Sequence, residues 1–71
     1  MLRYFYGLPF IVHGPAHFEF NGSNEVIAKA EIFFDGSWWV LQATLYTGRV
    51  LTREFVSRDA AMRLVAGRAA A

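Results

Sequence analysis

The chain has 71 residues, no cysteine and a formal net charge of +1, with 55% hydrophobic and 18% charged residues. This composition excludes a disulfide framework and a zinc site built on thiolates, and it gives no general electrostatic drive toward nucleic acid or an anionic membrane. We expect one domain, residues 1–71, stabilised almost entirely by apolar burial. No stretch approaches the roughly 20 apolar residues that span a bilayer, so we expect a cytoplasmic protein without membrane contact.

The first residues predict two short strands, residues 2–6 and 10–13. Gly7 and Pro9 force a bend between the two strands. Neither strand shows a clear alternation of apolar and polar side chains, so the sequence does not place this segment in the sheet.

Residues 16–20 alternate apolar and polar side chains, as expected of a strand with one buried face. Asn21-Gly22 is a strong hairpin signal. A loop of Asn21-Gly22-Ser23 places Phe18 opposite Val26. This strand then contributes its phenylalanines to the apolar face of the hairpin that follows.

The clearest strand periodicity lies in residues 26–34 and 38–46. Asp35-Gly36 between them predicts a two-residue turn, because both positions tolerate positive φ. In that register Phe33 and Trp38 are cross-strand neighbours on the outer face. The opposite face collects only apolar residues: Ala28, Ala30, Ile32, Phe34, Trp39, Leu41, Ala43 and Leu45. The outer face collects Ile27, Lys29, Glu31, Phe33, Trp38, Val40, Gln42 and Thr44.

A third hairpin follows, with a three-residue loop of Tyr46-Thr47-Gly48 and Gly48 in the left-handed region. This register sets Leu51 opposite Ala43 and Phe55 opposite Trp39. Both residues of the last strand then join the apolar face.

The C-terminal segment predicts one short helix that begins after Ser57 as N-cap and ends near Gly67. Asp59 and Arg63 are four residues apart and predict an ion pair. The apolar stripe consists of Ala61, Leu64 and Val65. The expected fold is therefore α+β: an antiparallel β-meander of four to five strands with one C-terminal helix packed on one face.

Catalytic and metal-binding constellations are not indicated. His13 and His17 have helical metal-ligand spacing, but Gly14-Pro15 between them excludes a helix. His17, Glu19 and Glu31 are expected near one another on the outer face, where a short sheet offers no pocket to shift their pKa values. We expect no enzyme activity, no cofactor, no metal and no small-molecule substrate.

The outer sheet face carries the main functional hypothesis. Phe33, Trp38, Val40 and Tyr46 predict an aromatic patch that a single helix cannot also cover. Either residues 2–13 fold over this patch, or it docks a protein partner or a second copy as a homodimer. Aromatic residues are enriched at the energetic centres of such interfaces.

Nucleic-acid binding is the alternative, because sheets that display aromatic side chains can stack on unpaired bases. Lys29, Arg49 and Arg53 would then contact phosphates. The low net charge argues against this reading, since phosphate contacts dominate such affinities.

Residues 36–66 resemble the strand–strand–strand–helix modules of integrase arm-type DNA-binding domains. The matching features are Gly36-Ser37-Trp38, the hairpin Gly48, and Phe55-Val56-Ser57 before the helix that contains Ala61. The resemblance covers less than half of the chain and implies DNA recognition by the sheet, in a family whose sheet is usually more basic.

The sequence therefore favours a non-catalytic protein-binding module. Small cysteine-free domains of this build occur among regulators and phage-type inhibitors, including anti-CRISPR proteins. That comparison rests on the expected fold alone.

Overall fold

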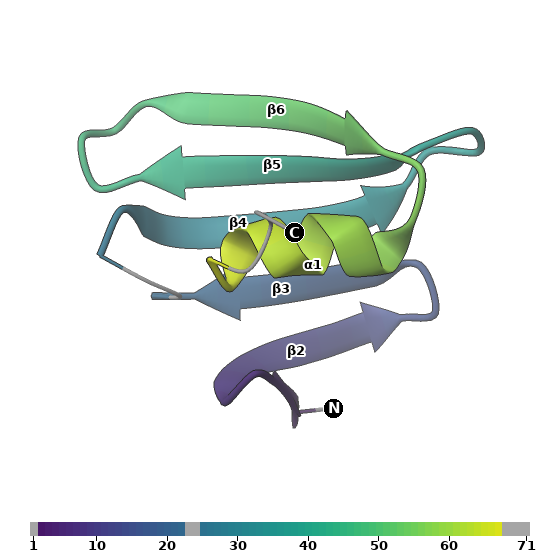
Figure 1. The fold of residues 1–71 in the computed structure, drawn as a ribbon, viewed down its shortest axis with the longest axis horizontal. Helices are drawn as coiled ribbons and strands as arrows, with labels where there is room; N and C mark the ends of the chain where they lie inside the picture. The colour runs from purple at the N-terminus through teal and green to yellow at the C-terminus, as the bar shows by residue number, and fades with distance from the viewer. Residues whose placement is uncertain (1, 23–24, 68–71) are drawn as a thin grey trace.

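The part of the chain that the structure describes folds into one antiparallel sheet with a single helix on one face (Figure 1). The computed structural model describes residues 2–22 and 25–67. Within these residues the sheet has six strands in the order β1-β2-β3-β4-β5-β6, so every strand pairs with its neighbour in sequence. The elements are β1 (Leu2–Phe5), β2 (Leu8–Gly14), β3 (His17–Asn21), β4 (Ile27–Phe34), β5 (Trp39–Leu45), β6 (Val50–Phe55) and α1 (Arg58–Val65).

The predicted meander and C-terminal helix are confirmed, but the predicted number of four to five strands is wrong. The leading segment forms a complete hairpin, in which Phe5 pairs with Leu8. Tyr6 and Gly7 form its turn, with φ values of 52° and 80°. Two consecutive positive φ angles give a turn whose twist matches that of the flanking strands. The expected bend at Gly7 is therefore a tight reversal that keeps both strands in the sheet.

The register of the β4–β5 hairpin differs from the predicted one by two residues. Phe34 pairs with Trp39 rather than Ser37, and Phe33 pairs with Val40 rather than Trp38. The cause is the Asp35 carboxylate, which accepts hydrogen bonds from the Ser37 and Trp38 amides at 2.9 and 2.8 Å. These bonds stabilise an Asx-type turn in a longer loop. Trp38 lies in this loop.

The register of the β3–β4 hairpin also differs from the predicted one. Phe18 pairs with Ile32 rather than Val26, and Val26 is exposed. The expected loop partly falls on residues 23–24, outside the described residues. Ile27, expected on the outer face, packs against the core, because the register shifts between Ile27 and Lys29.

The β5–β6 hairpin has the predicted register, with Ala43 opposite Leu51 and Trp39 opposite Phe55. Gly48 adopts φ +90° in its loop and donates its amide hydrogen to the Leu45 carbonyl at 2.9 Å. This register places Leu51 of β6 on the same face as Leu41 and Ala43 of β5, which is the face that carries α1.

The helix begins and ends as predicted. The Ser57 hydroxyl accepts from the Ala60 amide at 3.2 Å, and Gly67 follows the helix with φ +73°. Arg63 and Asp59 form the predicted ion pair at 2.9 Å. No helix in the described part of the chain is long and apolar enough to cross a membrane.

The core lies between α1 and the sheet. It is built around buried phenylalanines on β2 and β3, aliphatic and alanine side chains on β4 and β5, and one side of the helix. Its buried members are Phe10, Phe18, Phe20, Ala30, Ile32, Leu41, Ala43, Ala61, Met62 and Val65. The helix contacts β4, β5 and β6, and one helix leaves part of this face open.

Candidate functional site

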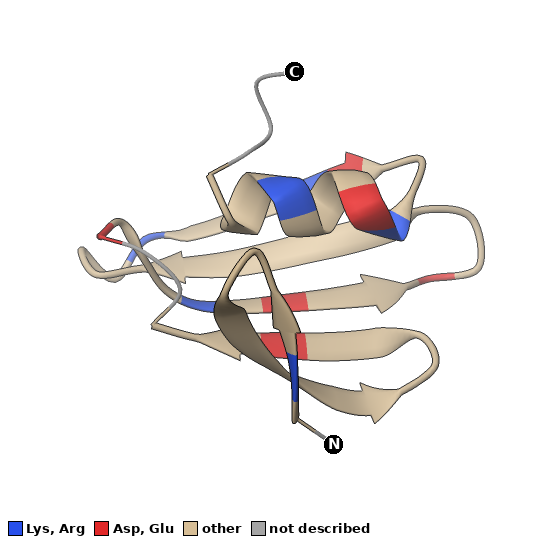
Figure 2. Cartoon of the chain, turned by 60° about the horizontal axis from the view of Figure 1, so that its bottom comes forward, with Lys and Arg blue, Asp and Glu red and all other residues tan. Residues whose placement is uncertain are grey.

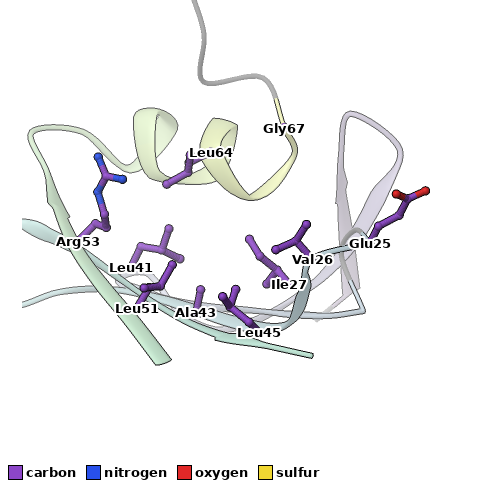
Figure 3. A pocket seen from close by; sticks show the side chains of 10 residues that line it. All are labelled: Glu25, Val26, Ile27, Leu41, Ala43, Leu45, Leu51, Arg53, Leu64 and Gly67. Atoms are coloured by element: carbon purple, nitrogen blue, oxygen red, sulfur yellow. The ribbon is translucent and has the colours of Figure 1, made fainter. Parts of the chain in front are cut away.

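An apolar groove runs beside the C-terminal half of α1, above strands β5 and β6 (Figure 3). Its volume is about 490 Å³. The side chains that give it its apolar character are Val26, Ile27, Leu41, Leu45, Leu51 and Leu64. We refer to this surface as the α1–β6 groove.

The groove exists because the helix is short. α1 has eight residues. It does not fully cover the side chains of β6 that lie on the same face of the sheet. Leu51 is 37% exposed and Val26 is 60% exposed. Leu41, by contrast, is 2% exposed and forms the buried floor of the groove. The groove is therefore open to solvent, and occupying it would remove further apolar area from water.

Charged residues lie at the two ends of the groove. Arg53 reaches up from β6 at one end, and Glu25 lies at the other (Figure 3). No ion pair to Arg53 forms within residues 2–22 and 25–67. An aliphatic groove beside a cation that has no carboxylate partner among the described residues offers apolar contact, together with a charge that selects the orientation of its occupant.

The residues of the predicted aromatic patch do not form one surface. Val40 is only 7% exposed, and Phe33 is partly buried. Trp38 and Tyr46 are exposed, but they flank opposite ends of β5. Residues 2–13 do not cover this face, because Phe5, Leu8 and Val12 pack against the core on the helix side.

The middle of the outer face is instead a polar network across β2, β3 and β4. His13 Nε2 lies 2.6 Å from Glu19 Oε1, and His17 Nε2 lies 3.0 Å from Glu31 Oε2. The two imidazole rings stack with their centroids 4.7 Å apart. Lys29 Nζ lies 3.7 Å from Glu19 and 3.6 Å from Glu31. The expected proximity of His17, Glu19 and Glu31 is thus observed.

This network consists mainly of solvent-exposed ionic and hydrogen-bonded pairs between neighbouring strands. Its acidic positions lie on neighbouring strands β3 and β4 (Figure 2). The lysine and both histidines are each at least 40% exposed. In the described part of the chain, no group of three metal-ligating side chains has the geometry to hold an ion. Cross-strand pairs of this kind stabilise a sheet modestly.

The pKa of the Glu19 carboxyl is held below its usual value of 4.5. The main cause is the hydrogen bond with His13, followed by the hydrogen bond from Asn21 and the positive charge of Lys29. Because the folded state favours the ionised carboxylate, this interaction stabilises the fold above a pH of about 4.5 and is lost as the pH falls through the lowered pKa.

Glu19→Gln is expected to lower the melting temperature at neutral pH, and the difference from the wild type is expected to narrow below a pH of about 4.5. Thermal unfolding followed by circular dichroism over a pH series measures this. Thr44→Ser, an uncharged change on the same face, should follow the wild-type profile. A difference that stays constant down to acid pH would show that Glu19 stabilises through packing alone.

The candidate phosphate-binding residues lie apart. Lys29 is on the outer face, between the two glutamates of the polar network. Arg53 lines the α1–β6 groove on the opposite face, and Arg49 follows the β5–β6 loop. They do not form the continuous basic track that binds a nucleic-acid backbone.

Sequence reasoning missed the groove, although it placed most of the lining residues on the correct face. One signal in the sequence could have indicated the groove. The apolar stripe of the predicted helix is shorter than the apolar face of the predicted strands, so the helix cannot cover that whole face. The comparisons with known proteins add no assignment: no family model, curated protein or solved structure matches the chain.

Proposed function

We propose that this chain is a non-catalytic protein-binding module that docks a partner protein in the α1–β6 groove. The observation that supports this proposal is the open aliphatic groove of about 490 Å³. Exposed apolar surfaces of this kind are typical of protein interaction sites. The cysteine-free composition favours work in the cytoplasm.

A protein fits this groove better than a small molecule. Pockets for small ligands enclose most of the ligand surface, whereas Leu51 and Val26 leave this groove open. Side chains from a protein surface can fill an open groove while the rest of the partner covers its rim. In this proposal the protein acts on its partner by binding alone, without catalysis, as a small regulator or a phage-type inhibitor does.

A peptide selection tests the proposal. The wild-type protein is expected to enrich binding peptides from a random displayed library. Leu51→Lys is expected to weaken binding of the enriched peptides at least about tenfold, because it places a second cation beside Arg53 and removes apolar contact. Fluorescence polarisation with labelled peptides measures the affinities.

Two further variants locate the binding surface. Leu2→Lys makes the same change at an exposed leucine on β1, at the other edge of the sheet, and should leave the affinity unchanged. Trp38→Ala removes the exposed tryptophan of the predicted aromatic patch and should also leave it unchanged. The proposal is contradicted if no peptide is enriched, if Leu51→Lys binds normally, or if Trp38→Ala alone abolishes binding.

A further inference from the structure

Strand β6 is an open sheet edge beside the groove. It has six residues and pairs only with β5 among the described strands. Its pairing with β5 shows no bulge. The opposite edge, β1, has four residues. Of these two edges, β6 offers the longer regular template for a further strand.

The hydrogen-bonding groups of β6 alternate between β5 and solvent. The Leu45 amide donates to the Arg49 carbonyl at 2.8 Å, which defines a hydrogen-bonded pair. In an antiparallel ladder every second pair is of this type, so the register directs the backbone groups of Leu51 and Arg53 toward β5. The backbone N–H and C=O groups of Val50, Thr52 and Glu54 therefore face the open edge.

The same strand lines the α1–β6 groove. The side chains of Leu51 and Arg53 lie on the helix side of β6 (Figure 3). A strand added to β6 would place every second side chain on that side, because side chains alternate between the faces of a sheet. Backbone pairing and filling of the groove would then be achieved by one extended segment.

Charge favours a different protein over a second copy of this chain as the source of that segment. If two β6 strands paired around Thr52, the two Arg53 side chains would be diagonal neighbours. Pairing around Arg53 would oppose the guanidinium groups directly, and pairing around Glu54 would oppose the carboxylates. Like charges in these positions destabilise a strand pair, whereas an acidic residue opposite Arg53 would stabilise it.

We propose that β6 accepts an antiparallel strand from a partner protein, with an acidic residue facing Arg53 and an aliphatic residue facing Leu51. This inference rests on the proposed binding function and adds the partner's conformation and charge. Strand addition combines backbone hydrogen bonds, which supply affinity, with side-chain contacts, which supply specificity.

A designed peptide tests this proposal. From the N-terminus, the peptide reads valine, lysine, glutamate, threonine, valine and isoleucine. Both of its termini are blocked. In the proposed pairing its glutamate faces Arg53, its lysine faces Glu54 and its second valine faces Leu51. Addition of the peptide to isotope-labelled protein is expected to shift the amide resonances of Val50, Thr52 and Glu54 saturably.

Two control peptides separate backbone pairing from simple apolar contact. Exchanging the lysine and glutamate preserves the composition but places like charges opposite Arg53 and Glu54. Methylating the threonine amide removes a donor to β6 and retains the side chains. Each change is expected to weaken binding at least about tenfold, which corresponds to roughly 1.4 kcal/mol.

A protein variant provides the reciprocal test. Thr52→Pro removes an amide hydrogen that faces solvent, a position where an edge strand tolerates proline. This variant is expected to unfold at the same temperature as the wild type and to lose its affinity for the designed peptide. If this variant unfolds, the amide-methylated peptide still tests the other hydrogen bond of the same residue pair, from the peptide threonine amide to the Thr52 carbonyl.

The outcomes distinguish this inference from the proposed function. Strand addition is wrong if the designed peptide fails to bind or if the amide-methylated peptide binds equally well. It is also wrong if the resonance shifts avoid the β6 amides. In each case the dependence of the selected peptides on Leu51 would still support groove binding. Loss of that dependence would overturn the proposed function itself.

Discussion

Phe20→Ala is expected to lower the free energy of unfolding by about 3–5 kcal/mol. Phe20 is 0% exposed, and its ring stacks on Phe10 with the centroids 5.1 Å apart. Removing the ring loses apolar burial and leaves a cavity beneath the helix. Small domains have a total stability of only about 5–15 kcal/mol, so a large share of the stability is lost. Urea unfolding followed by tryptophan fluorescence measures the change.

Phe34→Ala is the matched control for this prediction. Phe34 is 43% exposed and contacts Trp39 at the end of β4, with the ring centroids 5.3 Å apart. We expect a loss of about 1 kcal/mol there. Equal losses at both positions would show that the core is not centred on the phenylalanines of β2 and β3.

Ala61→Leu is expected to destabilise the protein by about 1–3 kcal/mol, because it adds volume where the helix meets the sheet. Ala61, Ala30 and Ala43 belong to the same buried cluster, and their exposures are 0%, 0% and 3%. Such small side chains let the helix lie close to the strands. A larger side chain must displace the helix or adopt an unfavourable rotamer. Thermal and urea unfolding measure the effect.

Ala60→Leu is the matched control in the same helix. Ala60 is only partly buried, and leucine and alanine have similar helix propensities. We expect its stability to change by less than about 0.5 kcal/mol. A stable Ala61→Leu variant with unchanged chemical shifts across β4 and β5 would contradict the close packing of α1.

The sequence determined which face of each central strand is buried better than it determined the strand pairing. The β4–β5 register differs from the expected one by two residues and the β3–β4 register by six, as shown by Phe34 with Trp39 and Phe18 with Ile32. Because side chains alternate with a period of two, an even shift preserves the buried face. Asp35 supplied the interaction that changed the turn, and dipeptide patterns do not reveal such a side-chain bond.

The candidate site was less predictable than the fold. The exposure of Trp38 was inferred from an expected position on a strand, although Trp38 lies in the loop between β4 and β5. A groove depends on how far a helix extends over a sheet, which composition does not specify. The role proposed for Arg53 likewise rests on its place beside Leu51 and Leu64 in the lining of the groove, and only the packed structure brings these residues together.

The strictly sequential order of the strands has a consequence for the folding mechanism. Each ladder joins neighbours in the chain, so each pairing closes only a short loop, and the entropic cost of loop closure is correspondingly small. Sheets dominated by nearby contacts fold faster than those that must first unite distant segments. We therefore expect rapid assembly by successive hairpins, with α1 docking after the strands that it contacts have formed.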